Sequence, residues 1–122
     1  MSADAKKLIE LMGIPCIEAP GEAEAQCSLL AKSGKAYGTM TEDMDALTFG
    51  TPFLVWNLNS KKEPIVLIEL DVILKDFDMT MAEFIDLCIL CGCDYTKHIK
   101  GVGPIKAFKY IKEHKTIEEV LK

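Results

Sequence analysis

Residues 13–50 read GIPCIEAPGEAEAQCSLLAKSGKAYGTMTEDMDALTFG, and this stretch decides the fold that the sequence predicts. It opens with Ile14–Ile17, a short apolar run between turn-forming residues that is typical of a buried strand. Apolar positions then recur at helical spacing until Gly34, and residues 35–40 indicate a second strand. Alternation of this kind predicts an α/β fold with a partial, mostly parallel sheet, right-handed crossovers and flanking helices.

Working outward, the same rules predict the remaining elements. The polar residues 59–63 join two apolar runs, which suggests a β-hairpin, and the last part of the chain is helical only. The expected elements are a helix over 4–12, a short helix over 45–47 capped by Thr41, strands over 53–58 and 64–70, and a helix over 81–91 with a Thr80–Glu83 capping box. After a turn over 101–104, a helix to His114 and a last helix capped by Thr116 are expected.

Charge is distributed unevenly along the chain. The 122 residues carry a net charge of −5 and are 49% hydrophobic, enough for one modest core. Residues 1–96 hold seven lysines against sixteen acids, whereas residues 97–122 hold seven lysines against three acids. We therefore expect a partial α/β unit with an acidic site over 1–96 and a basic helix–hairpin–helix module over 97–122, although charge asymmetry also serves solubility.

Cysteine usage and hydropathy indicate a compartment. The five cysteines are odd in number and lie mostly in apolar segments, unlike the framework of a small secreted domain. No apolar run reaches the roughly 18 residues of a membrane span, and Met1–Asp4 lacks the features of a signal peptide. We expect an intracellular protein that is neither secreted nor in the membrane.

Two pairs of acids follow two of the expected strands. Glu22 and Glu24 stand in the first turn of a helix, and Asp43 and Asp45 follow the next strand. The carboxyl ends of strands are where open α/β sheets bind ligands, so the two pairs are expected to converge. A simpler explanation of the glutamates is that acids in a first helical turn complement the helix dipole.

Four converging carboxylates would repel one another unless a multivalent cation neutralised them. Oxygen donors favour Mg²⁺ or Mn²⁺ over Zn²⁺, and two such ions about 4 Å apart suit in-line attack on a phosphodiester. Asp94 follows the end of a helix and is a fifth candidate, although an acid at such a place often only stabilises a turn. The acids therefore predict a two-metal hydrolase.

A glycine-rich turn marks the basic tail. Residues 99–106 read IKGVGPIK, with two glycines between short helices, where exposed backbone N–H groups can approach a phosphate. The pattern predicts a hairpin that grips DNA backbone, and a plain connection between helices is the alternative. The expected DNA-binding residues are Lys97, Lys100, Gly101, Val102, Gly103, Lys106 and Lys109.

Two other groups of residues are given structural roles. Cys88, Cys91, Cys93 and His98 are compatible with zinc, but the expected helix needs Cys88 and Cys91 for its apolar face. Aromatic residues in and before the hairpin are compatible with stacking on bases, yet a packed face of the hairpin is favoured, and they are assigned to the core. These aromatic residues are Phe49, Phe53 and Trp56.

Taken together, the motifs resemble the eukaryotic and archaeal flap endonucleases of the structure-specific 5′ nuclease superfamily. The order and spacing of the acid pairs, the Gly-x-Asp-Tyr element and the glycine hairpin all match. The segments that carry the resemblance are Leu11–Pro15, Ala19–Cys27, Thr41–Leu47, Asp86–Tyr95 and Gly101–Pro104. Gly21 departs from the hydroxyl residue that relatives often have, and Cys93 from the serine that many have.

The resemblance implies a PIN-like nuclease core and a nuclear enzyme that removes 5′ flaps in replication and repair, with both flap endonuclease and 5′–3′ exonuclease action. It implies that Glu22, Glu24, Asp43, Asp45 and Asp94 hold two Mg²⁺ ions, directly or through water. It also implies that the hairpin binds duplex backbone and often holds K⁺ through carbonyls near Ile99, Gly101 and Gly103.

The same resemblance implies that further aspartates, a helical arch and a tail that binds the sliding clamp lie outside this sequence. We therefore expect an internal fragment of the nuclease domain, with an incomplete catalytic site and little cleavage alone. A sister nuclease of the excision-repair, exonuclease or junction-resolving branches is an alternative. A non-catalytic DNA-binding module, whose acids are ordinary helix caps, is another.

Overall fold

The structure is a computed structural model that describes residues 2–122. Met1, which begins the segment expected not to be a signal peptide, lies outside the described residues. Within residues 2–122, no helix is long and apolar enough to cross a membrane.

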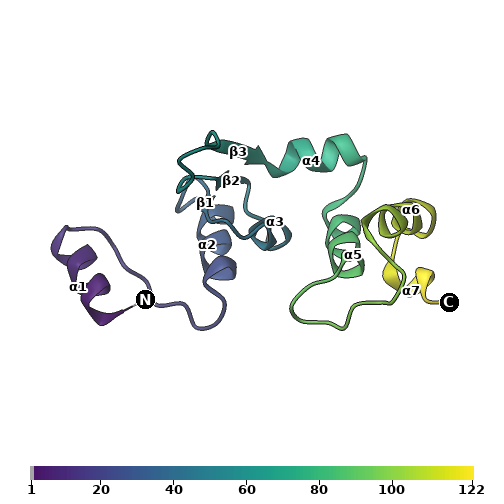
Figure 1. Cartoon of the computed structure of the whole chain (residues 1–122), viewed down its shortest axis with the longest axis horizontal. Coiled ribbons are helices and arrows are strands. Elements are labelled where there is room, and N and C mark those ends of the chain that lie inside the picture. Colours follow the sequence, from purple (N-terminus) through teal and green to yellow (C-terminus); the bar gives the residue numbers. More distant parts are fainter. Residues whose placement is uncertain (1) are drawn as a thin grey trace.

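Helices and strands are interspersed as far as residue 69, and the described elements after it are all helices (Figure 1). The α/β class is therefore confirmed. In chain order the described elements are α1 (Ala3–Leu11), α2 (Ala23–Lys32), β1 (Thr39–Met40), α3 (Asp45–Thr48), β2 (Phe53–Trp56), β3 (Val66–Glu69), α4 (Leu70–Phe77), α5 (Met81–Cys91), α6 (Pro104–His114) and α7 (Ile117–Val120).

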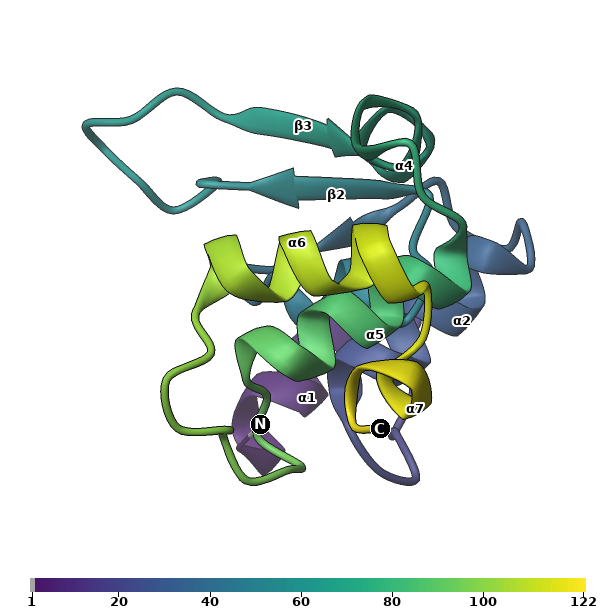
Figure 2. The ribbon, with the colours of Figure 1, turned by 90° about the vertical axis from the view of Figure 1, so that its right-hand side faces the viewer.

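The sheet is small and mixed. Its order is β1-β2-β3, with β1 parallel to β2 and β2 antiparallel to β3. The expected hairpin is present, and it forms an arm that extends past the helices (Figure 2). The expectation of a mostly parallel sheet is wrong for the described residues, because only one of the two strand pairs is parallel.

The segment Ile14–Ile17 is not a strand. It has no partner strand within residues 2–122, and Pro15 has no N–H to donate to one. Ile14 and Ile17 are 49% and 60% exposed, so the apolar character that predicted a buried strand is left uncovered. Figure 1 shows this segment leading from α1, at one end of the molecule, to α2.

The second expected strand is shortened to Thr39–Met40. Just before it, Gly38 lies so close to β2 that a Cβ would stand 2.5 Å from the carbonyl oxygen of Phe53. Glycine is therefore required where the chain enters the sheet.

Helix α4 was not expected. Leu70, Ile73, Leu74 and Phe77 have helical spacing, but the helix begins at the residue directly after β3, with no turn residue between them. The apolar run of the strand therefore continues into the helix and conceals the change of period. Asp78 ends α4 in the left-handed conformation, with φ of 50°.

Other helix ends agree with the sequence. Thr80 and Glu83 form the expected capping box of α5, Gly92 ends that helix, and the Thr116 side chain accepts a hydrogen bond from the backbone N–H of Glu119. Thr41, however, does not cap α3, whose first flanking residue is Met44.

Two clusters of buried side chains form the core, and α5 contributes to both. The first includes Leu54 of β2 and Phe84 of α5, and the second joins Leu90 of α5 to Ala107 and Ile111 of α6. Helix α6 accordingly lies along α5, with α7 beside them (Figure 2). Through α5, the basic tail shares a packed interior with the acidic body.

Candidate metal and DNA-binding site

The first pair of acids begins α2. Glu22 flanks the helix with an extended backbone and no capping hydrogen bond from its side chain, and Glu24 lies in the first turn. Farther along the same face of the fold, the buried Ser28 donates its Oγ hydrogen to the carbonyl oxygen of Ala46 over 3.2 Å. This bond fastens the helix that bears both glutamates to α3, which bears Asp45.

The second pair follows β1. The backbone N–H of Asp43 donates to the Thr41 hydroxyl over 3.1 Å, and the backbone N–H of Asp45 donates to Oδ1 of Asp43 over 2.9 Å. The loop after the strand therefore fixes the direction of the Asp43 carboxylate by hydrogen bonds to the backbone. Thr41 contributes to this turn instead of capping the helix.

Electrostatics show that the acids lie near one another around Asp45. Partial burial raises the pKa of the Asp45 carboxyl, and the charges of Asp43, Asp94 and Glu24 raise it further. Three acids from three separate segments thus act on one half-buried carboxylate. The expected convergence is present at the level of charge.

Tyr95 experiences the same group of acids. Burial raises the pKa of the Tyr95 hydroxyl, as do the charges of Glu22, Asp45, Asp94 and Asp43. Asp45 and Tyr95 together lie within the field of every acid in the expected set.

Within the described residues, no lysine or histidine forms an ion pair with these acids. Within residues 2–122, the ion pairs involve other acids, such as Glu18, Asp78 and Glu83. In the same part of the chain, no three His, Cys, Asp or Glu side chains come close enough together to hold one metal ion. The acids gather in one region without forming a closed coordination cage.

This arrangement fits a hydrated hard cation. Mg²⁺ typically keeps several waters and is held through one or two carboxylates, so it does not need three protein ligands at one point. The oxygen donors suit Mg²⁺ or Mn²⁺ chemically, and their unneutralised charge would attract either ion.

The sulfur-rich alternative finds no support among the described residues. All five cysteines are free thiols, and no metal-binding group forms from Cys88, Cys91, Cys93 and His98. Burial raises the pKa of the Cys88 thiol to about 12, so it stays protonated and behaves as an apolar side chain. The role assigned to Cys88 in the apolar face of its helix is consistent with this.

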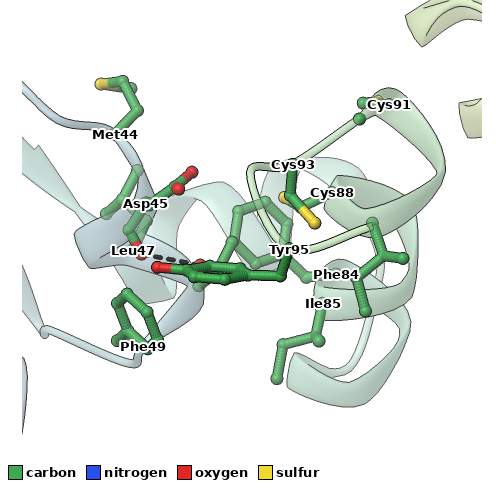
Figure 3. A pocket seen from close by; sticks show the side chains of 13 residues that line it. Met44, Asp45, Leu47, Phe49, Phe84, Ile85, Cys88, Cys91, Cys93 and Tyr95 are labelled. Atoms are coloured by element: carbon green, nitrogen blue, oxygen red, sulfur yellow. Dashed lines mark hydrogen bonds between the residues drawn. The ribbon is translucent and has the colours of Figure 1, made fainter. Parts of the chain in front are cut away.

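An apolar cavity of about 530 Å³ lies beside the acids. Side chains of α3 and the residue after it, Leu47 and Phe49, face Phe84 and Ile85 of α5, with Tyr95 between them (Figure 3). Sequence reasoning missed the cavity because its walls carry the same apolar pattern as a closed core.

The three aromatic residues expected in the core are only partly buried and lie in different places. Phe49 lines this cavity, and Phe53 stacks on the exposed Tyr37 with ring centroids 4.5 Å apart. Phe53 and Trp56 are three residues apart in β2, so they lie on opposite faces of the sheet. They do not form one packed face of the hairpin, and all three residues are only half-buried.

The glycine hairpin has a defined turn. Gly101 has φ of 84°, a conformation that favours glycine, and the backbone N–H of Val102 donates to the Ile99 carbonyl over 3.1 Å. Gly103 precedes α6 and accepts from the N–H of Ala107 over 2.9 Å. The Gly101 carbonyl accepts from Nζ of Lys106 over 3.0 Å. The three carbonyls expected near a potassium ion thus each accept one hydrogen bond.

Six of the seven lysines of the basic tail fall into two groups, and the seventh, Lys122, pairs with Glu119. Lys97, Lys100, Lys106 and Lys109 are exposed around the hairpin, and Lys109 lies 3.9 Å from Glu113. The second group holds the tail to the body. It consists of Lys112, which donates to the carbonyls of Phe77 and Asp78 and to the Asp78 carboxylate, and Lys115, which lies 3.7 Å from Glu83.

Most of the chain matches a known protein family. Residues 13–94, which include both acid pairs and Asp94, match the XPG I-region family. Because the match covers most of the chain, the chain belongs to the XPG I-region family.

Within that family the chain is most clearly similar to flap endonucleases. It is 61% identical to flap endonuclease 1 of Tetrahymena thermophila over 99% of its own length and 32% of the relative's. The chain thus spans about a third of the length of the curated relatives it matches. The resemblance to flap endonucleases drawn from the motifs is confirmed.

Solved structures agree with this result. Flap endonuclease-1 from Methanococcus jannaschii matches with a TM-score of 0.89 and 40% identity, over 98% of this chain and 38% of that one. The catalytic core of Rad2 in complex with DNA substrate matches with a TM-score of 0.88 and 32% identity, over 98% of this chain and 39% of that one. The fold is therefore that of these nuclease cores.

Proposed function

We propose that this chain is part of a flap endonuclease, an enzyme that hydrolyses phosphodiester bonds where 5′ flaps branch from duplex DNA. The observation that carries the proposal is that Asp45 and Tyr95 together lie within the field of the other four expected acids, which come from three segments. No ion pair within residues 2–122 includes any of the five acids. Identity of 61% to a flap endonuclease, against 32% to the Rad2 core, favours this branch of the superfamily.

The proposed metal ligands are the same five acids. Asp43 and Asp45, whose loop is held by backbone hydrogen bonds, would bind Mg²⁺ or Mn²⁺ most directly, and the remaining acids would bind directly or through water. They are Glu22, Glu24 and Asp94. When bound, a pair of such ions supplies an activated water and neutralises charge on the phosphate.

Several steps fall to the chain's own residues. The acids would hold the ions that neutralise the scissile phosphate, and Ser28 holds α2 against α3, the two helices that carry the acids. The hairpin would hold the duplex through the phosphates of the DNA backbone, because such contacts position DNA without reading its sequence. Binding should therefore be sensitive to salt and to DNA structure.

The residues proposed to bind DNA, or to shape the hairpin that binds it, lie in a helix–hairpin–helix module over residues 97–122, next to a partial PIN-like core over residues 1–96. They are Lys97, Lys100, Gly101, Val102, Gly103, Lys106 and Lys109. A potassium ion held by backbone carbonyls of the segment that contains Ile99, Gly101 and Gly103 is also part of the proposal, since a carbonyl oxygen that accepts one hydrogen bond keeps a second lone pair.

Properties of a whole protein are proposed in the same way. We propose action in the nucleus, a partnership with the sliding clamp through a tail outside this sequence, and little cleavage by this chain alone. The similarity to Rad2, whose catalytic core has been solved with DNA substrate, keeps a sister structure-specific nuclease as the second candidate.

The decisive experiment incubates the chain with end-labelled 5′-flap DNA and Mg²⁺, alone and mixed with the N-terminal region of the Tetrahymena relative. Cleavage in the mixture that is lost with Asp43→Asn plus Asp45→Asn supports a partial active site. Asp71→Asn serves as the matched control, since Asp71 is an exposed acid at the start of α4. A chain that cleaves by itself would disprove the incomplete site.

Binding of Mn²⁺, followed by electron paramagnetic resonance, separates the remaining alternatives. A nuclease fragment binds Mn²⁺ in the wild type and more weakly after Asp43→Asn. A DNA-binding module without catalysis would fold equally well in both forms and bind no Mn²⁺ in either. Cleavage of bubble or junction DNA in preference to flaps would identify a sister nuclease.

A further inference from the structure

Lys106 differs from the other lysines around the hairpin, because its ammonium group is already bound within the turn. Nζ of Lys106 donates to the carbonyl oxygen of Gly101 over 3.0 Å. We infer that Lys106 is a positioning residue that holds the hairpin closed and does not itself bind a DNA phosphate. This inference rests on the proposed function, since it concerns how the proposed DNA-binding turn is kept in shape.

The geometry of the turn indicates what the contact between Lys106 and Gly101 does. Gly101 has φ of 84°, which turns its carbonyl away from the path of a regular helix, and Gly103 enters α6 without a side-chain cap. Lys106 stands at the third position of α6 and reaches back five residues along the chain. It thereby joins the first turn of the helix to the glycine that begins the hairpin.

Charge adds a second reason. A carbonyl oxygen carries partial negative charge and would repel a phosphate brought against the turn. The ammonium of Lys106 offsets that charge at the carbonyl itself, and the first turn of α6 contains no acid that would compete for it. Lys106 therefore lowers the repulsion between the Gly101 carbonyl and an approaching phosphate without contacting the phosphate itself.

Other lysines provide the contrast. Lys97 and Lys100 precede the turn and form no ion pair within residues 2–122, so their charge is available for phosphates. Lys109 lies on α6 one turn after Lys106 and forms only a long contact of 3.9 Å with Glu113. The inference predicts that Lys106 and Lys109, on the same helix, affect DNA binding in different ways.

Salt dependence distinguishes the two roles. A lysine that neutralises a phosphate releases counterions, and its loss lowers the slope of log affinity against log salt concentration by about 0.9. A residue that only holds the turn changes the affinity by about the same factor at each salt concentration. Loss of one exposed charge-assisted hydrogen bond suggests a factor of about three to five.

The test measures binding of a fluorescent duplex to the whole chain by anisotropy, over a series of NaCl concentrations at a fixed KCl concentration. Lys106→Met should weaken binding about threefold to fivefold with an unchanged slope. Lys106→Gln, which keeps a donor for the Gly101 carbonyl but no charge, should recover part of this loss, again with an unchanged slope. Lys109→Met, the matched control, should lower the slope. Equal losses for Lys106→Met and Lys106→Gln, with a reduced slope, would overturn the inference.

Hydrogen exchange keeps the inference testable even if the chain does not bind duplex, a result that would count against the proposed function alone. The backbone N–H of Val102 donates across the turn to Ile99, so it reports whether the turn is closed. Its exchange should quicken about threefold to fivefold in Lys106→Met and stay unchanged in Lys109→Met. Unchanged exchange in Lys106→Met would show that Lys106 does not hold the turn.

Discussion

The charged side chains of the acidic site lack ion-pair partners within residues 2–122, whereas several in the basic tail have ion-pair or hydrogen-bond partners. No ion pair within residues 2–122 includes any of the five site acids. Burial raises the pKa of Asp45, and the charges of Asp43, Asp94 and Glu24 raise it further. In the tail, by contrast, Lys112 and Lys115 find acceptors on α4 and α5, and Lys106 finds one in its own hairpin. The acids therefore depend on a cation from outside the chain, whereas much of the basic charge also holds the fold together.

The largest expected effect breaks the interior that joins the two regions. Ile111 is fully buried between α5 and α6, and Ile111→Ala should lower the free energy of unfolding by about 2–5 kcal/mol, because it leaves a cavity in the second core cluster. Urea denaturation measures this loss. Ile105→Ala is the matched control, since Ile105 is 88% exposed on the same helix and its loss should be nearly neutral. Equal losses for both variants would contradict the packing of α6 on α5.

That shared interior also shows how far the sequence could lead. The helical stripe of α5, its capping box and the positions of the acid pairs were all readable, because they depend on local spacing. The strand expected at Ile14–Ile17 was wrong because pairing needs a partner that local sequence does not reveal. Helix α4 was missed where a strand passes into a helix without a turn.

The site shows the same limit. Its proposed acids could be named from the sequence, because Glu22 and Glu24 begin a helix and Asp43 and Asp45 follow β1, although the strand expected before Glu22 is absent from the described residues. The absence of three acids at one point in residues 2–122, and the cavity beside Asp45, depend on distances between segments that no spacing rule supplies. Likewise, lysine counts predicted a basic tail, but only the fold shows that Lys112 is occupied by the end of α4.

The next effect concerns the bond that aligns the two acid-bearing helices. Ser28→Ala removes the donor to the buried carbonyl of Ala46 and should lower the free energy of unfolding by about 1–3 kcal/mol. Mn²⁺ affinity, measured at a temperature where the variant is folded, should also fall. Ser33→Ala is the control, because the Ser33 hydroxyl also donates to a carbonyl but is exposed. Unchanged Mn²⁺ affinity would mean that Ser28 supports the fold without aligning the acids.

A smaller loss is expected where a lysine of the tail is tied to the body. Lys112→Met keeps the apolar part of the side chain but removes its bonds to the carbonyls of Phe77 and Asp78, and should lower the free energy of unfolding by about 0.5–1.5 kcal/mol. Lys109→Met, which removes only a long exposed contact, should change it by less. Thermal unfolding followed by circular dichroism compares the two, and a larger loss for Lys109→Met would contradict the division of lysines proposed here.

The smallest expected effect has the opposite sign. Because the folded state raises the pKa of Asp45, the folded chain holds the Asp45 proton more tightly than the unfolded chain, so its stability declines as pH rises from the ordinary aspartate value of 3.8 through the raised folded value. Asp45→Asn removes this penalty and should stabilise the metal-free chain at pH 7 by up to about 0.5 kcal/mol, a modest gain because solvent screens a half-buried group. The difference from the wild type should vanish at a pH below 3.8, where both side chains are neutral. Melting curves across this pH range, with Asp71→Asn as the exposed control, measure this difference in stability.

Added Mn²⁺ should reverse the order of stability by stabilising the wild type more than Asp45→Asn. A variant less stable than the wild type at pH 7 without metal would show that the acids are not mutually destabilising, and the contrast between the two regions would then fail at its acidic side.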